Sequence, residues 1–260
     1  MVYVMSDIHG NMERFDSILR QIELQPEDKL YILGDVIDRF PDGIRILRRI
    51  MKMPNVQMLL GNHEYMMMNA FAPKETFIDG PWSDEPPQKA YQLWYRNGGK
   101  VTHDYLKRIR KTVRQEICDY IYSLPLNLEV EVNGTKYMLF HGGAEAVFED
   151  WLLDWYPSKR AYAVWFRQRL WDPPVPDHIM IFGHTPTIEY AHEPLLSIWH
   201  NRDGDKIGID CGGGYPPPDP DDRFGFYGRL ACLRLDDMKE LSQQQVHCLF
   251  TAVFRPTGLP

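Results

Sequence analysis

Hydrophobic and polar positions along the first 70 residues follow two different periods. Near-continuous apolar runs predict buried strands, and between them apolar residues recur every three or four positions, as on one face of a helix. The helical spacing runs from Met12 to Ile22, again from Ile44 to Met51, and restarts in a Met-rich segment after Gly61. This strand-helix-strand order predicts parallel strands joined by right-handed crossovers. The strands are predicted at residues 2–5, 29–33 and 56–60.

The pattern loosens between about residue 72 and residue 122, where we expect a partly helical insertion that roofs one edge of the sheet. Helical spacing returns at residues 88–95 and 108–122, whereas the stretch before them is loop-like. Further on, Asn133-Gly134 separates two alternating segments and predicts a β-hairpin. Additional short strands are predicted at residues 178–182, 207–211 and 229–235. The proline-rich run at residues 215–228 is expected to be a surface excursion.

Composition narrows the class of protein. The chain has 260 residues with 44% hydrophobic content, and since no linker or repeat divides it we expect a single α/β domain spanning residues 1–260. A net charge of −7 argues against nucleic acid as a partner, although a local positive centre could still attract anionic substrates. We see no signal peptide and no apolar stretch of the roughly 20 residues that span a membrane, so a cytoplasmic protein is expected. The four cysteines form no CxxC pair and are expected to be reduced.

Polar side chains follow each predicted strand at the point where it ends. Asp7 and His9 come after the first strand, and they share a side if that segment stays extended. Because the carboxyl ends of neighbouring parallel strands face one crevice, these groups should converge. A single such residue is usually a turn or a cap, but the repetition at five strand ends indicates a metal site. The groups after the other strands are Asp35 with Asp38-Arg39, Asn62-His63-Glu64, His141 and His184.

Oxygen and nitrogen donors without cysteine suit manganese, iron, zinc or magnesium better than a structural zinc. A carboxylate in the middle of the set, such as Asp35, could bridge two ions about 3.5–4 Å apart. A hydroxide held between two such cations is a nucleophile at neutral pH and can attack phosphorus in line.

The motifs "SDIHGN", "LGDVIDRF", "LLGNHE", "HGG" and "FGHTP" occur in this order along the chain. Together they resemble the motif series of the calcineurin-like metallophosphoesterases, most closely the phosphoprotein phosphatase branch with its small bacterial and phage members. "IGIDCGGG" resembles the closing strand of that family. The resemblance implies an α/β fold of the metallophosphoesterase type, a β-sandwich of mixed sheets flanked by helices in four αββα layers.

The resemblance also implies two divalent metal ions as cofactors. Manganese is favoured, with iron, zinc and magnesium as alternatives. The first ion would be held by Asp7, His9 and Asp35, and Asp35 would bridge to the second. The remaining ligands of the second ion would be Asn62, His141 and His184.

Substrate-binding roles follow from the same resemblance. Arg39 would bind phosphate, and His63, oriented by Asp38, would donate a proton to the leaving group. "VWFRQRLW" resembles a segment whose Arg is a second phosphate ligand, which points to Arg167, with Arg169 as the alternative. Asn62 and His63 are expected to contact the phosphate as well.

The predicted activity is hydrolysis of phosphomonoesters, above all phosphoserine and phosphothreonine in proteins, by in-line attack of a metal-bridging hydroxide. A dinucleoside polyphosphate hydrolase, acting on diadenosine tetraphosphate, is the alternative, since such enzymes share the motif set. A catalytically silent binding domain is a more distant one. The expected partner is thus a phosphorylated protein or peptide, or a nucleotide, and the oligomeric state stays open.

Two positions depart from the family pattern. Ser6 stands where the family often has glycine, and should be tolerated if its dihedral angles are ordinary. Phe40 stands where glycine usually follows the Arg, and a large side chain there is expected to narrow or reshape the cleft. Trp82, Trp94 and the tryptophans between residues 151 and 171 fill the core or line a cleft, and core filling is favoured.

Overall fold

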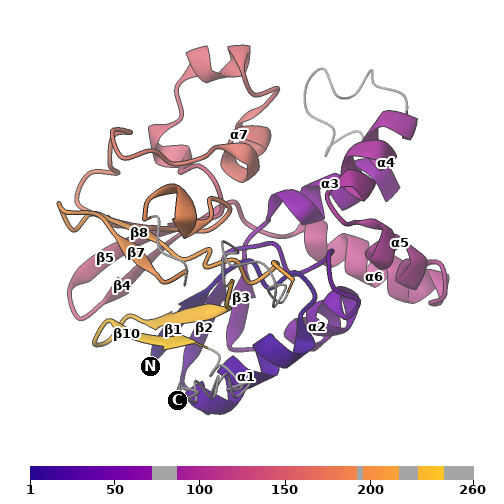
Figure 1. Ribbon diagram of the computed structural model, residues 1–260, viewed down its shortest axis with the longest axis horizontal. Helices are drawn as coiled ribbons and strands as arrows, with labels where there is room; N and C mark the ends of the chain where they lie inside the picture. Colours follow the sequence, from indigo (N-terminus) through magenta and orange to yellow (C-terminus); the bar gives the residue numbers. More distant parts are fainter. Residues whose placement is uncertain (72–86, 192–195, 217–227, 243–260) are drawn as a thin grey trace, which may run out of the picture.

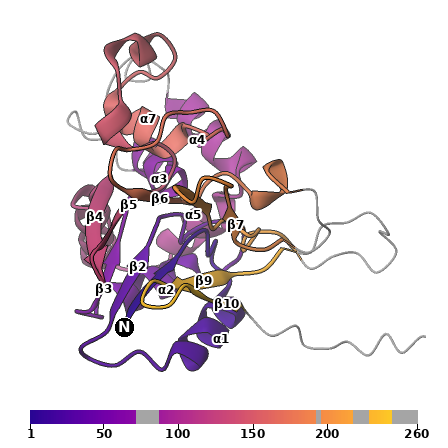
Figure 2. The same cartoon turned by 90° about the vertical axis from the view of Figure 1, so that its left-hand side faces the viewer.

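The computed structural model describes residues 1–71, 87–191, 196–216 and 228–242, and in it two five-stranded mixed sheets pack face to face (Figures 1 and 2). The first sheet has the order β10-β9-β1-β2-β3, in which β1, β2 and β3 are parallel and β9 pairs antiparallel with both β1 and β10. Its strands are β1 (Val2–Met5), β2 (Lys29–Ile32), β3 (Val56–Met58), β9 (Ala231–Arg234) and β10 (Lys239–Ser242).

The second sheet has the order β4-β5-β6-β8-β7, with three parallel strands between two antiparallel edge strands. The predicted hairpin is confirmed, because Val132 pairs with Thr135 across a turn in which Asn133 and Gly134 both have positive φ, at 52° and 79°. The strands of this sheet are β4 (Asn127–Val132), β5 (Thr135–Phe140), β6 (Ile179–Phe182), β7 (Trp199–His200) and β8 (Lys206–Gly208).

The core lies in layers on both faces of the first sheet. Along β1, Val4 points between the two sheets, where it joins residues such as Ile181 and Leu233. Tyr3 and Met5 point to the opposite face and pack against the helices. This alternation is the two-residue period of a strand, and burial on both faces explains the unbroken apolar run in the sequence.

Most helices lie beside the first sheet (Figure 1). The first begins where the Asn11 side chain accepts a hydrogen bond from the N–H of Arg14 at 3.1 Å, a typical N-cap. The outer face of the second sheet, including Phe140 and Phe182, is covered by irregular segments and short 3₁₀ helices. The helices are α1 (Met12–Ile22), α2 (Gly43–Ile50), α3 (Asn62–Phe71), α4 (Pro87–Arg96), α5 (Lys100–Leu106), α6 (Lys111–Tyr122) and α7 (Lys159–Trp165).

The predicted α/β fold of two mixed sheets flanked by helices is confirmed. Several helices and strands were not predicted, namely α5, α7, β7 and β10. Strand β7 has two residues, and β10 reads Lys-Glu-Leu-Ser, so neither shows an alternating pattern of useful length. The loop-like stretch at residues 72–86 and most of the proline-rich run lie outside the described residues.

The prediction that the tryptophans fill the core is wrong for three of them. Trp94 is fully buried, whereas Trp151, Trp155 and Trp171 are 59%, 78% and 75% exposed. Trp82 lies outside the described residues. None of the described helices is long and apolar enough to cross a lipid bilayer.

Candidate metal and catalytic site

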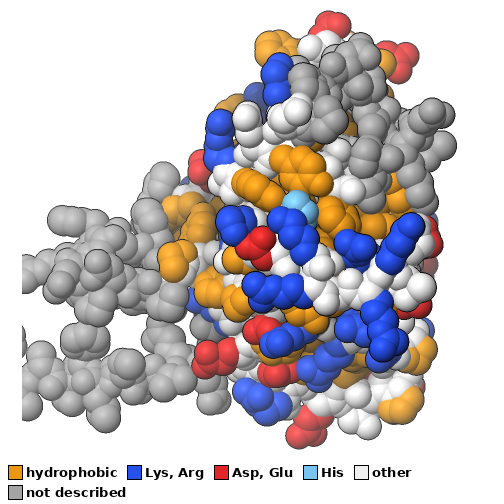
Figure 3. Space-filling view, turned by 90° about the vertical axis from the view of Figure 1, so that its right-hand side faces the viewer, with side chains coloured by type: hydrophobic (Ala, Val, Ile, Leu, Met, Phe, Trp, Pro, Cys, Tyr) orange, Lys and Arg blue, Asp and Glu red, His pale blue; other side chains and the backbone are white. Residues whose placement is uncertain are grey.

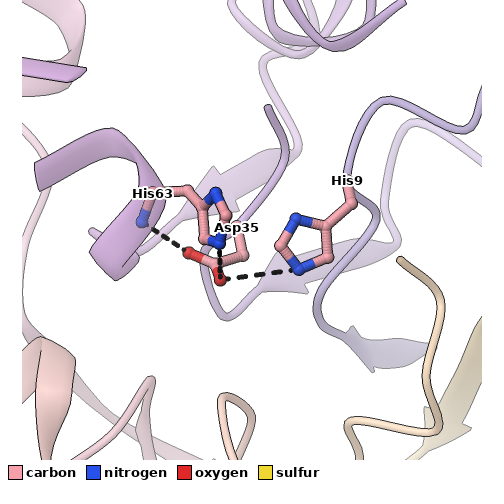
Figure 4. A group of neighbouring side chains, drawn as sticks. All are labelled: His9, Asp35 and His63. Carbon is pink, nitrogen blue, oxygen red and sulfur yellow. Dashed lines mark hydrogen bonds and ion pairs between the residues drawn. The ribbon is translucent and has the colours of Figure 1, made fainter. Parts of the chain in front are cut away.

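The polar residues that follow β1, β2, β3, β5 and β6 come together around the Asp35 carboxylate. Its Oδ2 lies 3.6 Å from His9 Nε2, and its Oδ1 lies 3.5 Å from His141 Nε2. Figure 4 shows the carboxylate between His9 and His63. Each oxygen therefore faces a different group of potential ligands. The two groups are His9, Asp35 and His63, and Asp35, His141 and His184.

The backbone at these strand ends is left-handed. Ten described residues other than glycine have positive φ, and six of them are predicted site residues, with φ between 48° and 72°. Each costs about 1–2 kcal/mol in a non-glycine residue, so the surrounding structure must impose it. The expectation that the segment from Asp7 to His9 stays extended is therefore wrong, although their side chains do meet, with His9 Nε2 3.8 Å from Asp7 Oδ1. The six residues are Asp7, His9, Asp35, Asp38, Arg39 and His184.

Backbone hydrogen bonds hold the loop after β2 in place. The carboxylate of Glu64, which is fully buried, accepts from the N–H groups of Asp35, Val36 and Ile37 at 3.0, 2.9 and 3.3 Å. The N–H of His9 in turn donates to the carbonyl of Asp35 at 2.9 Å. Glu64 thus positions the residues that face the site, a role that the sequence reading did not assign to it.

The histidine rings are oriented as metal ligands usually are. Nδ1 of His9 lies 3.2 Å from the Ile37 carbonyl, and Nδ1 of His141 lies 2.6 Å from the Leu33 carbonyl. A proton on Nδ1 leaves the Nε2 lone pair directed at the Asp35 side. Nε2 of His184 is buried and has no hydrogen-bond partner within the described part of the chain. An unpartnered buried nitrogen beside carboxylates is what a divalent cation would satisfy, so these residues fit such an ion.

Burial decides the direction of the pKa shift at three residues of the site, and neighbouring charges decide it at Asp35. Burial lowers the pKa of His9 and of His184 well below the ordinary value, which keeps both rings in the neutral form that binds metals. Burial also raises the pKa of Asp7, which lies close to the Asp35 charge. The pKa of Asp35 itself is lowered, because His141, His63 and His9 together outweigh the effect of burial.

His63, Asp38 and Arg39 form a second arrangement beside the first. His63 Nδ1 lies 2.7 Å from Asp38 Oδ2, and its Nε2 lies 3.5 Å from an Nη atom of Arg39. Burial alone would lower the pKa of His63, but the Asp35 and Asp38 carboxylates raise it above the ordinary value. The same Nε2 is 3.8 Å from Asp35 Oδ2, so the geometry suits either a proton donor or a further metal ligand.

The structure separates the two candidate phosphate-binding arginines. An Nη atom of Arg167 donates to the carbonyl of His184 at 3.0 Å, which places this side chain against the metal-ligand group. The guanidinium of Arg169 lies instead over the ring of Trp171, 5.8 Å from its centre. Asn62 belongs to the same surroundings, because its Oδ1 lies 2.9 Å from His141 Nε2. All ten predicted site residues are thus brought to one region.

The structure describes the surroundings of Ser6 and Phe40, the two residues that depart from the family pattern. Ser6 has no positive φ, and its hydroxyl donates to Asp7 Oδ2. Phe40 is half-buried, and its N–H donates to the His9 carbonyl at 3.0 Å. Gly10 lets the backbone of Phe40 approach closely, since a Cβ there would lie 2.4 Å from the Phe40 carbonyl oxygen. The expected narrowing of the cleft by the Phe40 side chain stays a prediction.

One wall of the site was not predicted. Gly214 lies so close that a Cβ would be 2.2 Å from His9 Cδ2 and 2.7 Å from an Nη atom of Arg39. Asp210 holds this glycine-rich turn by accepting from the N–H of Gly212 at 3.0 Å. Three consecutive glycines end the run "IGIDCGGG", which resembles the closing strand of the family. Such a glycine run is the sequence signal that could have predicted close approach of the backbone to the site.

Comparison with known proteins agrees with this geometry. A model of the calcineurin-like phosphoesterase family matches residues 1–207, and the chain belongs to this family. It is 30% identical over 154 residues to serine/threonine-protein phosphatase 2 of Escherichia coli, covering 56% of this chain and 62% of that protein. It is 36% identical over 72 residues to the symmetrical bis(5'-nucleosyl)-tetraphosphatase of Erwinia tasmaniensis, covering 27% and 26%. The chain therefore spans less than two thirds of each of these relatives.

Solved structures share the fold at low sequence identity. A cold-active protein-tyrosine phosphatase of a Shewanella species has a TM-score of 0.52 at 15% identity, with 94% of this chain and 80% of that chain covered. A protein serine/threonine phosphatase from Saccharomyces cerevisiae has a TM-score of 0.51 at 14% identity, with 93% and 78% covered.

We predict that Gly214→Ala lowers the rate of p-nitrophenyl phosphate hydrolysis by about 10²-fold, because the new methyl group must displace His9 or Arg39. Steady-state kinetics and thermal unfolding measure the effect. Gly208→Ala is the matched control, since a Cβ there meets its nearest neighbour at an ordinary 3.4 Å. Wild-type kinetics for Gly214→Ala would show that this wall does not constrain the site.

Proposed function

We propose that this protein is a metal-dependent phosphatase that hydrolyses phosphomonoesters, with phosphoserine and phosphothreonine in proteins as its main substrates. The observation that carries the proposal is the position of Asp35. Its two carboxylate oxygens face separate ligand groups, and the His63–Asp38 pair and Arg39 lie directly beside them. This arrangement can hold two cations and a phosphoryl group next to a proton donor.

The metal ligands are proposed as the sequence resemblance implied. Asp7, His9 and Asp35 would hold one ion, and Asp35, whose two oxygens face both ligand groups, would serve the other as well. When bound, the two ions lower the pKa of water and neutralise charge on the phosphoryl group. Manganese is the proposed metal, because oxygen and nitrogen donors without sulfur suit it. The ligands that complete the second ion are Asn62, His141 and His184.

Arg39 and Arg167 would bind the phosphoryl oxygens through hydrogen bonds from their guanidinium groups. Both side chains are exposed, and both lie next to predicted ligand residues. Their planar forks can donate pairs of hydrogen bonds to phosphate, which a lysine cannot reproduce. Arg167 is proposed in preference to Arg169, whose guanidinium lies over Trp171.

A positive surface supports an anionic substrate. Although the net charge is −7, Lys and Arg side chains gather on the face shown in Figure 3. Helix α2 starts four residues after Arg39, and a hollow along it and just past its end is lined by Arg45, Arg48, Arg49 and Lys52. Such a field raises the local concentration of phosphorylated or acidic partners.

His63 would complete the reaction as the proton donor. Water would add to phosphorus and its two protons would stay on the inorganic phosphate formed, while the phosphorus–oxygen bond to the serine breaks and the proton from His63 Nε2 ends on the leaving oxygen. Because Nδ1 is held by Asp38, Nε2, which lies beside the Arg39 guanidinium, is the nitrogen that would face that oxygen. An alkoxide is a strong base and needs this proton in the transition state.

Hydrolysis of dinucleoside polyphosphates is the second candidate function, since one relative is named as a tetraphosphatase. A side-by-side assay with manganese, on phosphopeptides and on diadenosine tetraphosphate, separates the two. We expect kcat/KM to be higher for phosphopeptides, because the alignment to the protein phosphatase extends over 56% of this chain and that to the tetraphosphatase over 27%. The reverse order would assign the protein to nucleotides.

The metal assignment predicts two ions per chain at saturating manganese. Asp35→Ala should weaken both sites together, because its two oxygens face both groups, whereas Asn62→Ala should weaken mainly one. Titration calorimetry with metal analysis measures this. A stoichiometry of one in the unaltered protein would contradict the two-metal site.

The proton-donor assignment predicts that His63→Asn lowers kcat on a phosphoserine peptide by about 10²–10⁴-fold. The loss on p-nitrophenyl phosphate should be clearly smaller, because nitrophenolate leaves without a proton. Metal content should stay at the wild-type value. If instead one metal ion is lost, His63 is a ligand, as its 3.8 Å distance from Asp35 Oδ2 also allows.

A further inference from the structure

The segment from Trp94 to Thr102, at the junction of α4 and α5, contacts Asp38 and Arg39 in three places. The indole Nε1–H of Trp94 donates to Asp38 Oδ2 at 2.9 Å. The N–H of Asp38 donates to Thr102 Oγ1 at 3.1 Å, and the N–H of Arg39 donates to the Gly98 carbonyl at 3.2 Å. Part of the predicted insertion is therefore built into the site and does more than cover it.

These contacts fall on strained backbone. Asp38 and Arg39 are consecutive residues with φ of 72° and 64°. Two adjacent non-glycine residues in the left-handed region persist only where neighbouring groups impose the conformation. The hydrogen bonds from Thr102 and Gly98 act on the backbone of this pair, whereas the bond from Trp94 acts on the side chain of Asp38.

Trp94 and His63 donate to the same carboxylate oxygen. Asp38 Oδ2 accepts from His63 Nδ1 at 2.7 Å and from Trp94 Nε1 at 2.9 Å. Asp38 is fully buried, and its Oδ1 has no hydrogen-bond partner among the residues that the structure describes. With the indole N–H removed, His63 would be the sole side-chain donor to this carboxylate within the described part of the chain. The carboxylate could then turn about its last torsion angle.

The indole itself cannot easily move. Trp94 is fully buried in the same cluster as the residues of α3, and Gly99 lies against its ring. A Cβ at Gly99 would be 2.2 Å from both Cδ1 and Nε1 of the indole, so only glycine permits this approach. The N–H of Gly99 donates to the Trp94 carbonyl at 2.9 Å and closes the turn. The donor is thus fixed in place before any substrate binds.

We propose that Trp94 is a positioning residue for proton donation: its indole N–H holds the Asp38 carboxylate in the orientation that keeps His63 directed at the leaving group. This inference rests on the proposed role of His63 as proton donor. Trp94 touches neither the phosphoryl group nor a metal ligand in this scheme, so its influence should appear only in steps that need the proton.

The test replaces the N–H while keeping the shape of the side chain. A genetically encoded 3-benzothienylalanine at position 94 substitutes sulfur for the indole N–H, and Trp94→Phe provides a second variant. We expect kcat on a phosphoserine peptide to fall about 10-fold, a part of the 10²–10⁴-fold that loss of a general acid costs. KM and the rate on p-nitrophenyl phosphate should change less than about twofold, because nitrophenolate needs no proton.

Leu106→Ala is the matched control. Leu106 is fully buried in α5 within the same cluster, but it makes no recorded hydrogen bond to Asp38. It should lower the unfolding temperature at least as much as the benzothienyl variant without changing the ratio of the two rates. If Leu106→Ala changes that ratio as well, loosening of the insertion explains the effect and the assignment of Trp94 is overturned.

A double-mutant cycle separates this inference from the function on which it rests. In the His63→Asn background, Trp94→Phe should add no further leaving-group-dependent loss, because both changes act through one proton donor. If His63→Asn shows the leaving-group signature and the Trp94 variants do not, Trp94 is only a core residue. If His63→Asn itself slows both substrates equally, the proton-donor role fails, whatever the Trp94 variants do.

Discussion

The buried carboxylate of Asp35 is the group on which the rest of the site depends. It is 2% exposed, and removing an ionised carboxylate from water costs several kcal/mol unless partners compensate. The rings of His9, His63 and His141 lie 3.5–3.8 Å from its oxygens, and the N–H of His63 donates to Oδ1 at 3.0 Å. A divalent cation on each side would complete this compensation, which explains why so many donors are collected around one side chain.

Crowding around Asp35 dictates the small residues nearby. A Cβ at Gly61 would lie 2.3 Å from both the N and Oδ1 of Asp35, and one at Gly183 would lie 2.5 Å from Asp7 Oδ2. The glycines in "GNHE" and "FGHTP" are therefore required by close approach of the backbone to the carboxylates. The left-handed residues at the strand ends also help to crowd the site, because they turn side chains toward Asp35 within a few positions of the end of a strand.

Helices α4 and α5 and the turn between them help to fix the positions of Asp38 and Arg39. Through Trp94, Gly98 and Thr102 they contact Asp38 and Arg39, which lie beside the candidate metal ligands. A change that loosens α4 or α5 is therefore expected to shift Asp38 and Arg39 as well.

The sequence by itself determined the class of fold and the identity of the candidate site residues. Period-two and period-3.6 patterns reveal which residues are buried. Parallel strands of one sheet bring their carboxyl ends to one edge, so Asp7, Asp35 and Asn62, which follow β1, β2 and β3, could be predicted to meet. His141 follows a strand of the other sheet, and the packing of the two sheets brings it to Asp35. It did not predict β10 or α5, whose short polar segments carry no periodic signal. Only the tertiary structure decided that Glu64 holds the loop after β2, that Gly214 forms a wall, and that Trp94 reaches Asp38. Those contacts join residues far apart in the chain or depend on left-handed turns, and local pattern contains no information about either.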